Sequence, residues 1–304
     1  MRSARDVWGN ARQHTPDYEF LDVPRGTLTE GPVWLPDRRE LLWVDIMENS
    51  ISRAGLDGSD LMTWTMPGEV GFAVPADDGS LIVGQPDGIH HVDLTTREAR
   101  PLALLPERDP RIRVNDGKCD HTGRVWFGTM HRAENEPLGK LFTVTPEGVE
   151  AVVEGLCTGN GIGWSPDGTR VYYTDSGTPR CLYAADFDAE RGRVSHSRLF
   201  LPPEYPGNPD GLCVDSEGCL WGARWQASAL VRITPEGVVT DVYHTPMFRP
   251  TSCCFAGPEL DELVVTSADW GEGAGPCAGR IMRFRPGARG LAEVPARMDL
   301  MPEP

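Results

Sequence analysis

Residues 157–175, CTGNGIGWSPDGTRVYYTD, contain two apolar runs that flank a Ser-Pro-Asp-Gly turn. An apolar run, a polar turn and a second apolar run are together typical of a β-hairpin. Asn160 stands between two glycines just before the first run. The role of this asparagine depends on whether the same hairpin recurs along the chain.

The hairpin pattern occurs six times in the 304 residues. Aligned at the end of the first apolar run, the copies place these residues at one position: Trp34, Val74, Cys119, Trp164, Val214 and Phe255. By subtraction, neighbouring copies are 40, 45, 45, 50 and 41 residues apart. Each copy continues with a third and a fourth, weaker strand pattern, and four strands in a period of this length indicate a β-propeller blade. The sequence therefore predicts an all-β, six-bladed β-propeller.

The repeats leave little of the chain outside the ring, so we expect residues 1–304 to form a single propeller domain. Residues 1 to about 19 would be an N-terminal extension. The following extended segment, in YEFLDVP (18–24), could complete a blade with the C-terminal strands. Such closure would leave no long sheet edge open to aggregation.

The composition limits the classes of molecule that the protein could bind. The net charge of −16 argues against nucleic acid, whose phosphates require clustered Lys and Arg. The chain has neither an apolar run long enough for a membrane helix nor the apolar stretch of a secretory signal near its start, so a cytoplasmic location is expected. The eight cysteines form no C-x-x-C pair and are interpreted as reduced core residues. Nothing implies an obligate protein partner.

The repeat brings distant polar residues to one height. The first strands of all blades run in the same direction around the axis, so equivalent positions should form a ring. Four positions before each aligned residue stand Glu30, Val70, Asn115, Asn160, Asp210 and Thr251. Carboxylate and amide oxygens without His or Cys favour one divalent ion such as Ca²⁺, Mg²⁺ or Mn²⁺, and admit Zn²⁺ or Fe²⁺ when water completes the coordination. Asn160 is thus interpreted as one oxygen donor of a central metal site.

Several motifs carry a family resemblance in a fixed order. They are EGPVW from Glu30, RVNDGKCD from Arg113, GNGIGWSPDG from Gly159, NPDGLCVDSEGCLW from Asn208 and TSCCF from Thr251. Over roughly residues 20–284 the chain resembles the gluconolactonase/regucalcin family, also called senescence marker protein or luciferin-regenerating-enzyme-like. The resemblance implies a six-bladed propeller that holds a divalent cation through Glu30, Asn160 and Asp210. It also implies that Arg113 and Asn115 contact substrate hydroxyls.

One segment departs from the family pattern. Beyond the GTM motif some members supply an acidic substrate contact, whereas GTMHRAENE places His131 and Arg132 there. This difference leaves the identity of the substrate open. Arg113 stands six positions before its aligned residue, on the same side of the strand as Asn115, which favours the pocket over the surface.

The expected activity is metal-dependent hydrolysis of a sugar lactone, such as gluconolactone or a pentonolactone, to the aldonic acid. Asp210 is the candidate base for the attacking water, and Glu30 would serve mainly as a ligand. Two alternatives stay open. A metal-dependent esterase or phosphotriesterase would use the same cation and base, and a calcium-binding propeller without catalysis would bind the ion alone.

Overall fold

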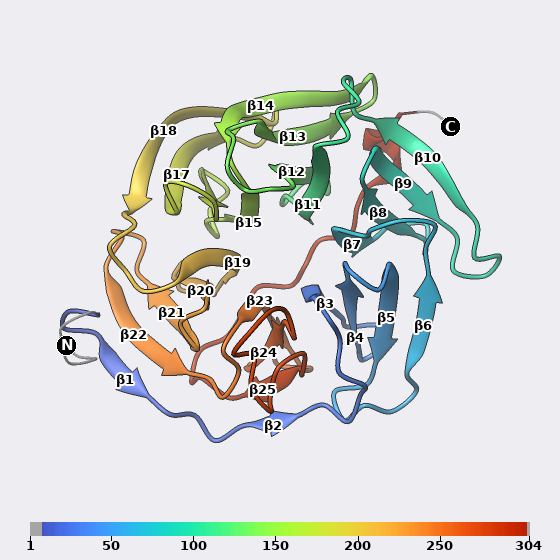
Figure 1. The fold of residues 1–304 in the computed structure, drawn as a ribbon. Coiled ribbons are helices and arrows are strands. Elements are labelled where there is room, and N and C mark those ends of the chain that lie inside the picture. The colour runs from blue at the N-terminus through green and yellow to red at the C-terminus, as the bar shows by residue number, and fades with distance from the viewer. Residues whose placement is uncertain (1–7, 303–304) are drawn as a thin grey trace.

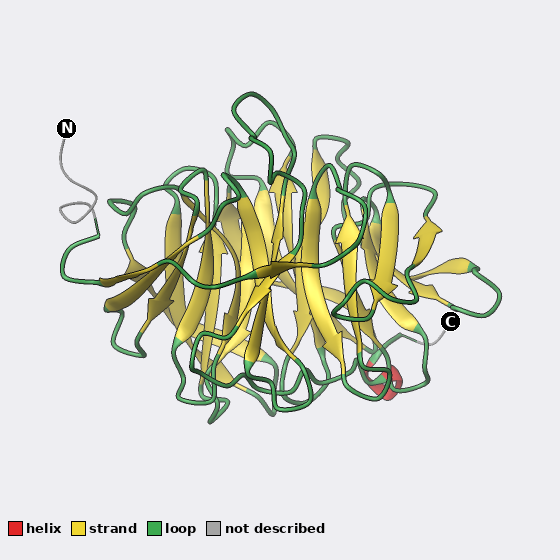
Figure 2. Ribbon diagram, turned by 90° about the horizontal axis from the view of Figure 1, so that it is seen from below, coloured by secondary structure: helices red, strands yellow, loops and turns green. Residues whose placement is uncertain are grey.

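Each copy of the sequence repeat forms one sheet, and the six sheets stand around a central axis (Figure 1). The computed structural model describes residues 8–302. The strands run mainly along the axis, and the turns collect at its two ends (Figure 2). The predicted all-β, six-bladed propeller is confirmed. Within residues 8–302, no helix has the length and hydropathy needed to cross a bilayer.

The first strand of each sheet lies nearest the axis, and the later strands follow outward (Figure 1). The first sheet contains β3 (Thr29–Leu35), β4 (Glu40–Asp45), β5 (Ser50–Ala54) and β6 (Met62–Thr65). The second contains β7 (Phe72–Pro75), β8 (Leu81–Gln85), β9 (Gly88–Val92) and β10 (Ala99–Leu104). The third contains β11 (Ile112–Cys119), β12 (Val125–His131), β13 (Gly139–Thr145) and β14 (Gly148–Leu156).

The remaining sheets follow the same order. The fourth contains β15 (Gly159–Trp164), β16 (Arg170–Asp175), β17 (Cys181–Asp188) and β18 (Arg193–Leu201). The fifth contains β19 (Asn208–Val214), β20 (Leu220–Trp225), β21 (Ala229–Ile233) and β22 (Val239–His244). The sixth contains β23 (Pro250–Ala256), β24 (Glu262–Ser267) and β25 (Met282–Phe284).

The N-terminal segment joins the last two sheets from outside. β1 (Arg12–His14) pairs in parallel with β22, and β2 (Glu19–Phe20) pairs antiparallel with β25. The sixth sheet therefore takes its outermost strand from the start of the chain. Residues before position 20 do more than extend from the ring, because β1 adds a fifth strand to its sheet.

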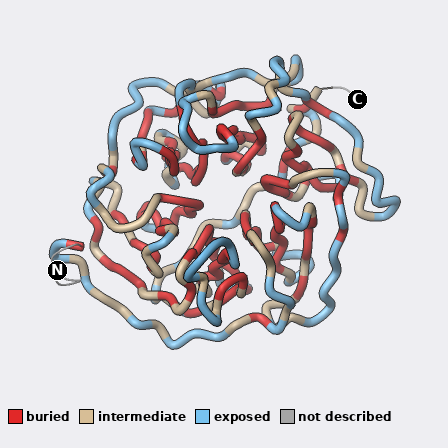
Figure 3. The backbone as a smooth tube through the Cα atoms, in the orientation of Figure 1, coloured by how far each residue is buried: buried red, intermediate tan, exposed pale blue. Residues whose placement is uncertain are grey.

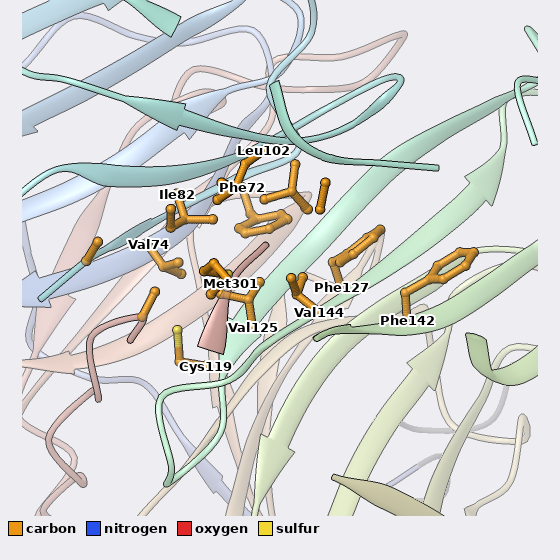
Figure 4. Close-up of a cluster of buried hydrophobic side chains, with 14 of the residues drawn as sticks. Phe72, Val74, Ile82, Leu102, Cys119, Val125, Phe127, Phe142, Val144 and Met301 are labelled. Carbon is orange, nitrogen blue, oxygen red and sulfur yellow. The ribbon is translucent and has the colours of Figure 1, made fainter. Parts of the chain in front are cut away.

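Apolar side chains fill the spaces between neighbouring sheets. Near the axis the chain is mostly buried, while the outermost strands are largely exposed (Figure 3). Figure 4 shows one such cluster, in which Phe127 stacks on Phe142 with ring centroids 5.2 Å apart and lies 6.4 Å from Phe72. Full burial of each such side chain contributes about 1.5–3 kcal/mol. The inner strands are covered on both faces, so most of their residues are buried, polar ones included.

The C-terminal tail crosses one end of the channel. Ala296 and Met301 pack into the cluster of Figure 4, and the 3₁₀ turn η1 (Met298–Leu300) lies beside them. Within the tail, Glu293 pairs with Lys118 of β11 at 3.2 Å. The tail therefore closes the end of the channel opposite the first residues of the inner strands.

Candidate active site

A cavity of about 260 Å³ opens where the inner strands begin. Two sets of equivalent repeat positions supply most of its wall. Residues four positions before the aligned residues contribute Glu30, Asn115, Asn160 and Asp210. Residues six positions before contribute Leu28, Arg113, Thr158, Asn208 and Arg249. All five residues predicted for the site therefore line one cavity, although they come from four different blades.

A bulge in the inner strand explains how these side chains reach the axis. The pairing between the first and second strands shifts by one residue at this height in five of the six sheets, for example between Asn160 and Gly163. A bulge bends the strand and redirects the side chain beside it. Gly161 has a φ of +44°, and a Cβ there would lie 2.4 Å from the carbonyl oxygen of Asp210. Glycine is required at this position because two blades approach so closely.

The two remaining members of the predicted ring do not face the cavity. Thr251 donates from Oγ1 to the carbonyl oxygen of Thr29 at 2.6 Å, which ties the sixth sheet to the first. Val70 is fully buried in the apolar cluster between the first two sheets. The ring position at this height is therefore supplied to the cavity by four blades of the six.

The two acidic residues of the ring are buried without a cationic partner. Glu30 and Asp210 are each 7% exposed, and within residues 8–302 neither forms a salt bridge with Lys, Arg or His. Burial, reinforced by the charges of Asp210 and Asp116, raises the pKa of Glu30 well above its usual range. Burial and the charge of Asp116 likewise raise the pKa of Asp210. A bound cation would remove this unfavourable energy, because opposite charge favours the ionised carboxylates.

Asn160 bonds directly to one of these two carboxylates, that of Asp210. Its Nδ2 donates to Asp210 Oδ1 at 2.5 Å and to Ser176 Oγ at 3.0 Å, and its Oδ1 accepts from the backbone N–H of Gly161 at 2.9 Å. The amide of Asn160 thus lies directly beside the Asp210 carboxylate. The donor set fits a hard divalent cation, since carboxylate and amide oxygens converge on one cavity.

Arg113 and Asn115 occupy the blade next to Asn160. Asn115 Nδ2 donates to the carbonyl oxygen of Gly159 at 3.2 Å, which leaves its Oδ1 available to a ligand. Arg113 donates from Nη1 to the carbonyl oxygen of Val114 at 3.0 Å, and burial lowers the pKa of its guanidinium. The remaining N–H groups of Arg113 suit hydroxyl or carbonyl oxygens of a small polar ligand.

Two buried aspartates fix the backbone at the edge of the cavity. Asp175 accepts the backbone N–H groups of Cys157 and Thr158 at 3.0 and 2.8 Å, and Asp45 does the same for Thr27 and Leu28 at 2.7 and 3.1 Å. These bonds fix the segment that leads into an inner strand. Both aspartates stand eleven positions after the aligned residue of their repeat, so the two blades use the same contact.

Sequence reasoning missed two charged residues of the wall. Glu134 lines the cavity, whereas Arg132 pairs with Glu69 at 2.6 Å and His131 is buried. Arg249 lines it as well. The repeat could have predicted Arg249, because this residue stands six positions before Phe255. It could not have predicted Glu134, which lies in an irregular loop outside the repeated strands.

A second group of potential metal ligands lies away from the cavity. Ligand atoms of Asp215, Glu217 and Cys219 fall within 4.8 Å of one another. Both carboxylates, however, already pair with Arg232, at 2.8 and 2.5 Å. Asp215 also accepts from the indole of Trp221 at 2.9 Å. These contacts occupy oxygens of both carboxylates and remove part of their negative charge, so the group resembles a structural ion-pair network rather than a metal site.

The order of motifs and the geometry of the ring agree with one family. Residues 28–269 match the SMP-30/Gluconolactonase/LRE-like region. The chain belongs to this family. Among its relatives, pentonolactonase XacC of Haloferax volcanii is 34% identical over 283 residues, which cover 88% of this chain and 93% of the relative. L-arabinolactonase of Azospirillum brasilense is 34% identical over 260 residues, covering 82% and 83%.

A solved structure shows how closely this family member keeps the fold. Regucalcin from Agrobacterium tumefaciens, described as a calcium-binding protein, superposes with a TM-score of 0.89 at 26% identity. The match covers 95% of this chain and all of that one. The family predicted from the motifs is therefore confirmed.

Proposed function

We propose that this protein is a metal-dependent hydrolase that opens a sugar lactone to its aldonic acid. The observation that carries the proposal is the convergence of Glu30, Asn160 and Asp210 on a cavity that Arg113 and Asn115 also line. Relatives named as lactonases that cover most of the chain support the same chemistry. The cavity volume of about 260 Å³ lies below the roughly 300–1,000 Å³ of drug-sized pockets, which suits a monosaccharide.

One divalent ion, with Ca²⁺, Zn²⁺, Mn²⁺, Mg²⁺ and Fe²⁺ as the candidates, would be held by Glu30, Asn160 and Asp210. The buried, unpaired carboxylates support this assignment, because two such groups repel each other without a cation. When bound, the ion would polarise the lactone carbonyl and stabilise the negative charge that develops on its oxygen.

The side chains divide the remaining work. The Asp210 carboxylate takes a proton from water as the water oxygen attacks the lactone carbonyl carbon. The bond from that carbon to the ring oxygen then breaks, and the protonated Asp210 returns its proton to the ring oxygen, which becomes a hydroxyl. Arg113 and Asn115 orient the sugar through its hydroxyls, and Glu30 keeps the ion in place.

Hydrolysis of aldonolactones tests this proposal. Metal-stripped protein is assayed by acid release on five- and six-membered lactones, with Ca²⁺, Mg²⁺, Mn²⁺, Zn²⁺ or Fe²⁺ added back and spontaneous opening subtracted. We expect turnover that depends on one added ion. Tight binding of an ion without turnover on any lactone would instead favour a calcium-binding propeller, the alternative supported by the similarity to regucalcin. Turnover of simple esters or phosphotriesters above that of lactones would favour the other hydrolase classes.

A further inference from the structure

Arg249 occupies the same repeat position as Arg113. Arg249 stands six residues before Phe255 in the sixth blade, and Arg113 stands six residues before Cys119 in the third. Blades three apart in a ring of six lie on opposite sides of the axis, as β11 and β23 do in Figure 1. Both arginines line the cavity, so it has a guanidinium on two opposing walls.

The guanidinium of Arg249 has unused donors. The residue is 6% exposed, and its Nη2 donates to the carbonyl oxygen of Glu272 at 2.9 Å. Its Nε and Nη1 are buried and have no hydrogen-bond partner within residues 8–302. The side chain is held over the rings of Phe248 and Trp225, at 4.8 and 5.6 Å. A buried cation with unsatisfied donors is costly unless something binds it.

A neighbouring arginine shows what a purely structural role looks like in this fold. Arg224, 2% exposed, donates from Nε and Nη2 to the carbonyl oxygens of Tyr205, Pro206 and Gly207, at 2.9–3.0 Å. Those bonds fix the loop before β19. Arg249 has one such bond in place of three, so fixing a loop does not account for its remaining donors.

The charge of the wall favours an anion once the ion is bound. The lining carboxylates are Glu30, Glu134 and Asp210, and the lining guanidiniums are Arg113 and Arg249. A divalent ion would leave this set with net positive charge. Arg249 would then be the cation of the sixth blade, across the axis from the residues assigned to the sugar hydroxyls. A planar guanidinium with free N–H groups matches the oxygens of a carboxylate, sulfonate or phosphate.

We propose that Arg249 forms an anion subsite that selects sugar lactones carrying an acidic group at the end of the molecule away from the lactone carbonyl. That the ligand is a lactone rests on the proposed function, whereas the binding of an anion by Arg249 does not. The shared chemistry is an oxyanion at the guanidinium of Arg249 where this residue lines the cavity, with Trp225 packed against the guanidinium.

Binding of open-chain acids tests the subsite independently of turnover. Calorimetric titration of the metal-loaded protein compares D-gluconate with 6-phospho-D-gluconate and with D-glucarate, whose terminal groups are phosphate and carboxylate. We expect the wild type to bind at least one of the doubly acidic compounds about 10- to 100-fold more tightly than D-gluconate. The stronger of the two identifies the terminal group.

Variants separate the subsite from general effects of charge. Arg249→Met should reduce the preference to within about 3-fold, because the charge-assisted bonds are lost. Arg180→Met removes the same charge from an exposed side chain in the β16–β17 loop, which starts at the cavity residue Ser176, and should keep the preference. Arg249→Lys keeps the charge without the planar donor fork and should fall between them. If Arg249→Met does not fold, the comparison of Arg249→Lys with Arg180→Met gives the answer.

Two results would overturn the subsite. One is equal affinity of the wild type for all three acids, and the other is a preference that survives replacement of Arg249. If the wild-type protein showed no lactone turnover but kept a preference for doubly acidic compounds that depends on Arg249, only the proposed function would be contradicted.

Discussion

Replacement of Asp210 by Asn is the sharpest test of the proposed division of roles. The substitution keeps the size of the side chain, and an amide oxygen at this position can still accept the hydrogen bond that Asn160 Nδ2 now donates at 2.5 Å. An amide, however, cannot take a proton from water. Loss of a positioned general base lowers turnover by about 10²- to 10⁴-fold, which corresponds to roughly 3–5 kcal/mol of transition-state stabilisation.

The assay must separate loss of the base from loss of the ion. Turnover at saturating lactone is measured at rising metal concentration, with bound metal quantified for each variant. Asp241→Asn is the matched control, because Asp241 is a buried carboxylate of the same blade that bonds to Arg12 and His14 and does not line the cavity. We expect this control to retain more than about a tenth of wild-type turnover. If Asp210→Asn with full metal occupancy also retained that much, Asp210 would not be the base.

Three further predictions concern stability and the ion. The pKa values of Glu30 and Asp210 are raised in the metal-free fold, so their contribution to stability is fully present below about pH 4 and is lost as the pH rises. Added divalent ion should therefore raise the melting temperature more at pH 8 than at pH 5. An equal shift of the melting temperature at both pH values would contradict this. Gly161→Ala should lower the free energy of unfolding by about 2 kcal/mol or more and weaken metal binding, because of its positive φ and the nearby Asp210 carbonyl, as denaturant titration and calorimetry would show. Lys118→Met should lower the free energy of unfolding by roughly 3 kcal/mol by leaving Glu293 unpaired, and the double variant with Glu293→Gln should recover part of that loss in a denaturant titration.

The sequence by itself determined the propeller, because every blade repeats one local pattern. An apolar run, a turn and a second run recur at a fixed distance from positions such as Trp164, and strand periodicity and turn chemistry are local properties of the chain. The same register predicted which residues would face the axis. It needed only the rule that equivalent positions in a ring lie at one height, and Glu30, Asn160 and Asp210 do line one cavity.

Tertiary structure alone decided which polar residues of the register face the cavity and which hold the ring together. Thr251 occupies the same repeat position as the predicted metal ligands, but its hydroxyl bonds to the backbone of Thr29 in the next blade. This contact between the sixth and first sheets closes the ring. Glu134 reaches the cavity from an irregular loop, and Glu293 reaches Lys118 from the far end of the chain. Such contacts depend on how distant segments meet in space, and no local pattern in the sequence encodes that meeting.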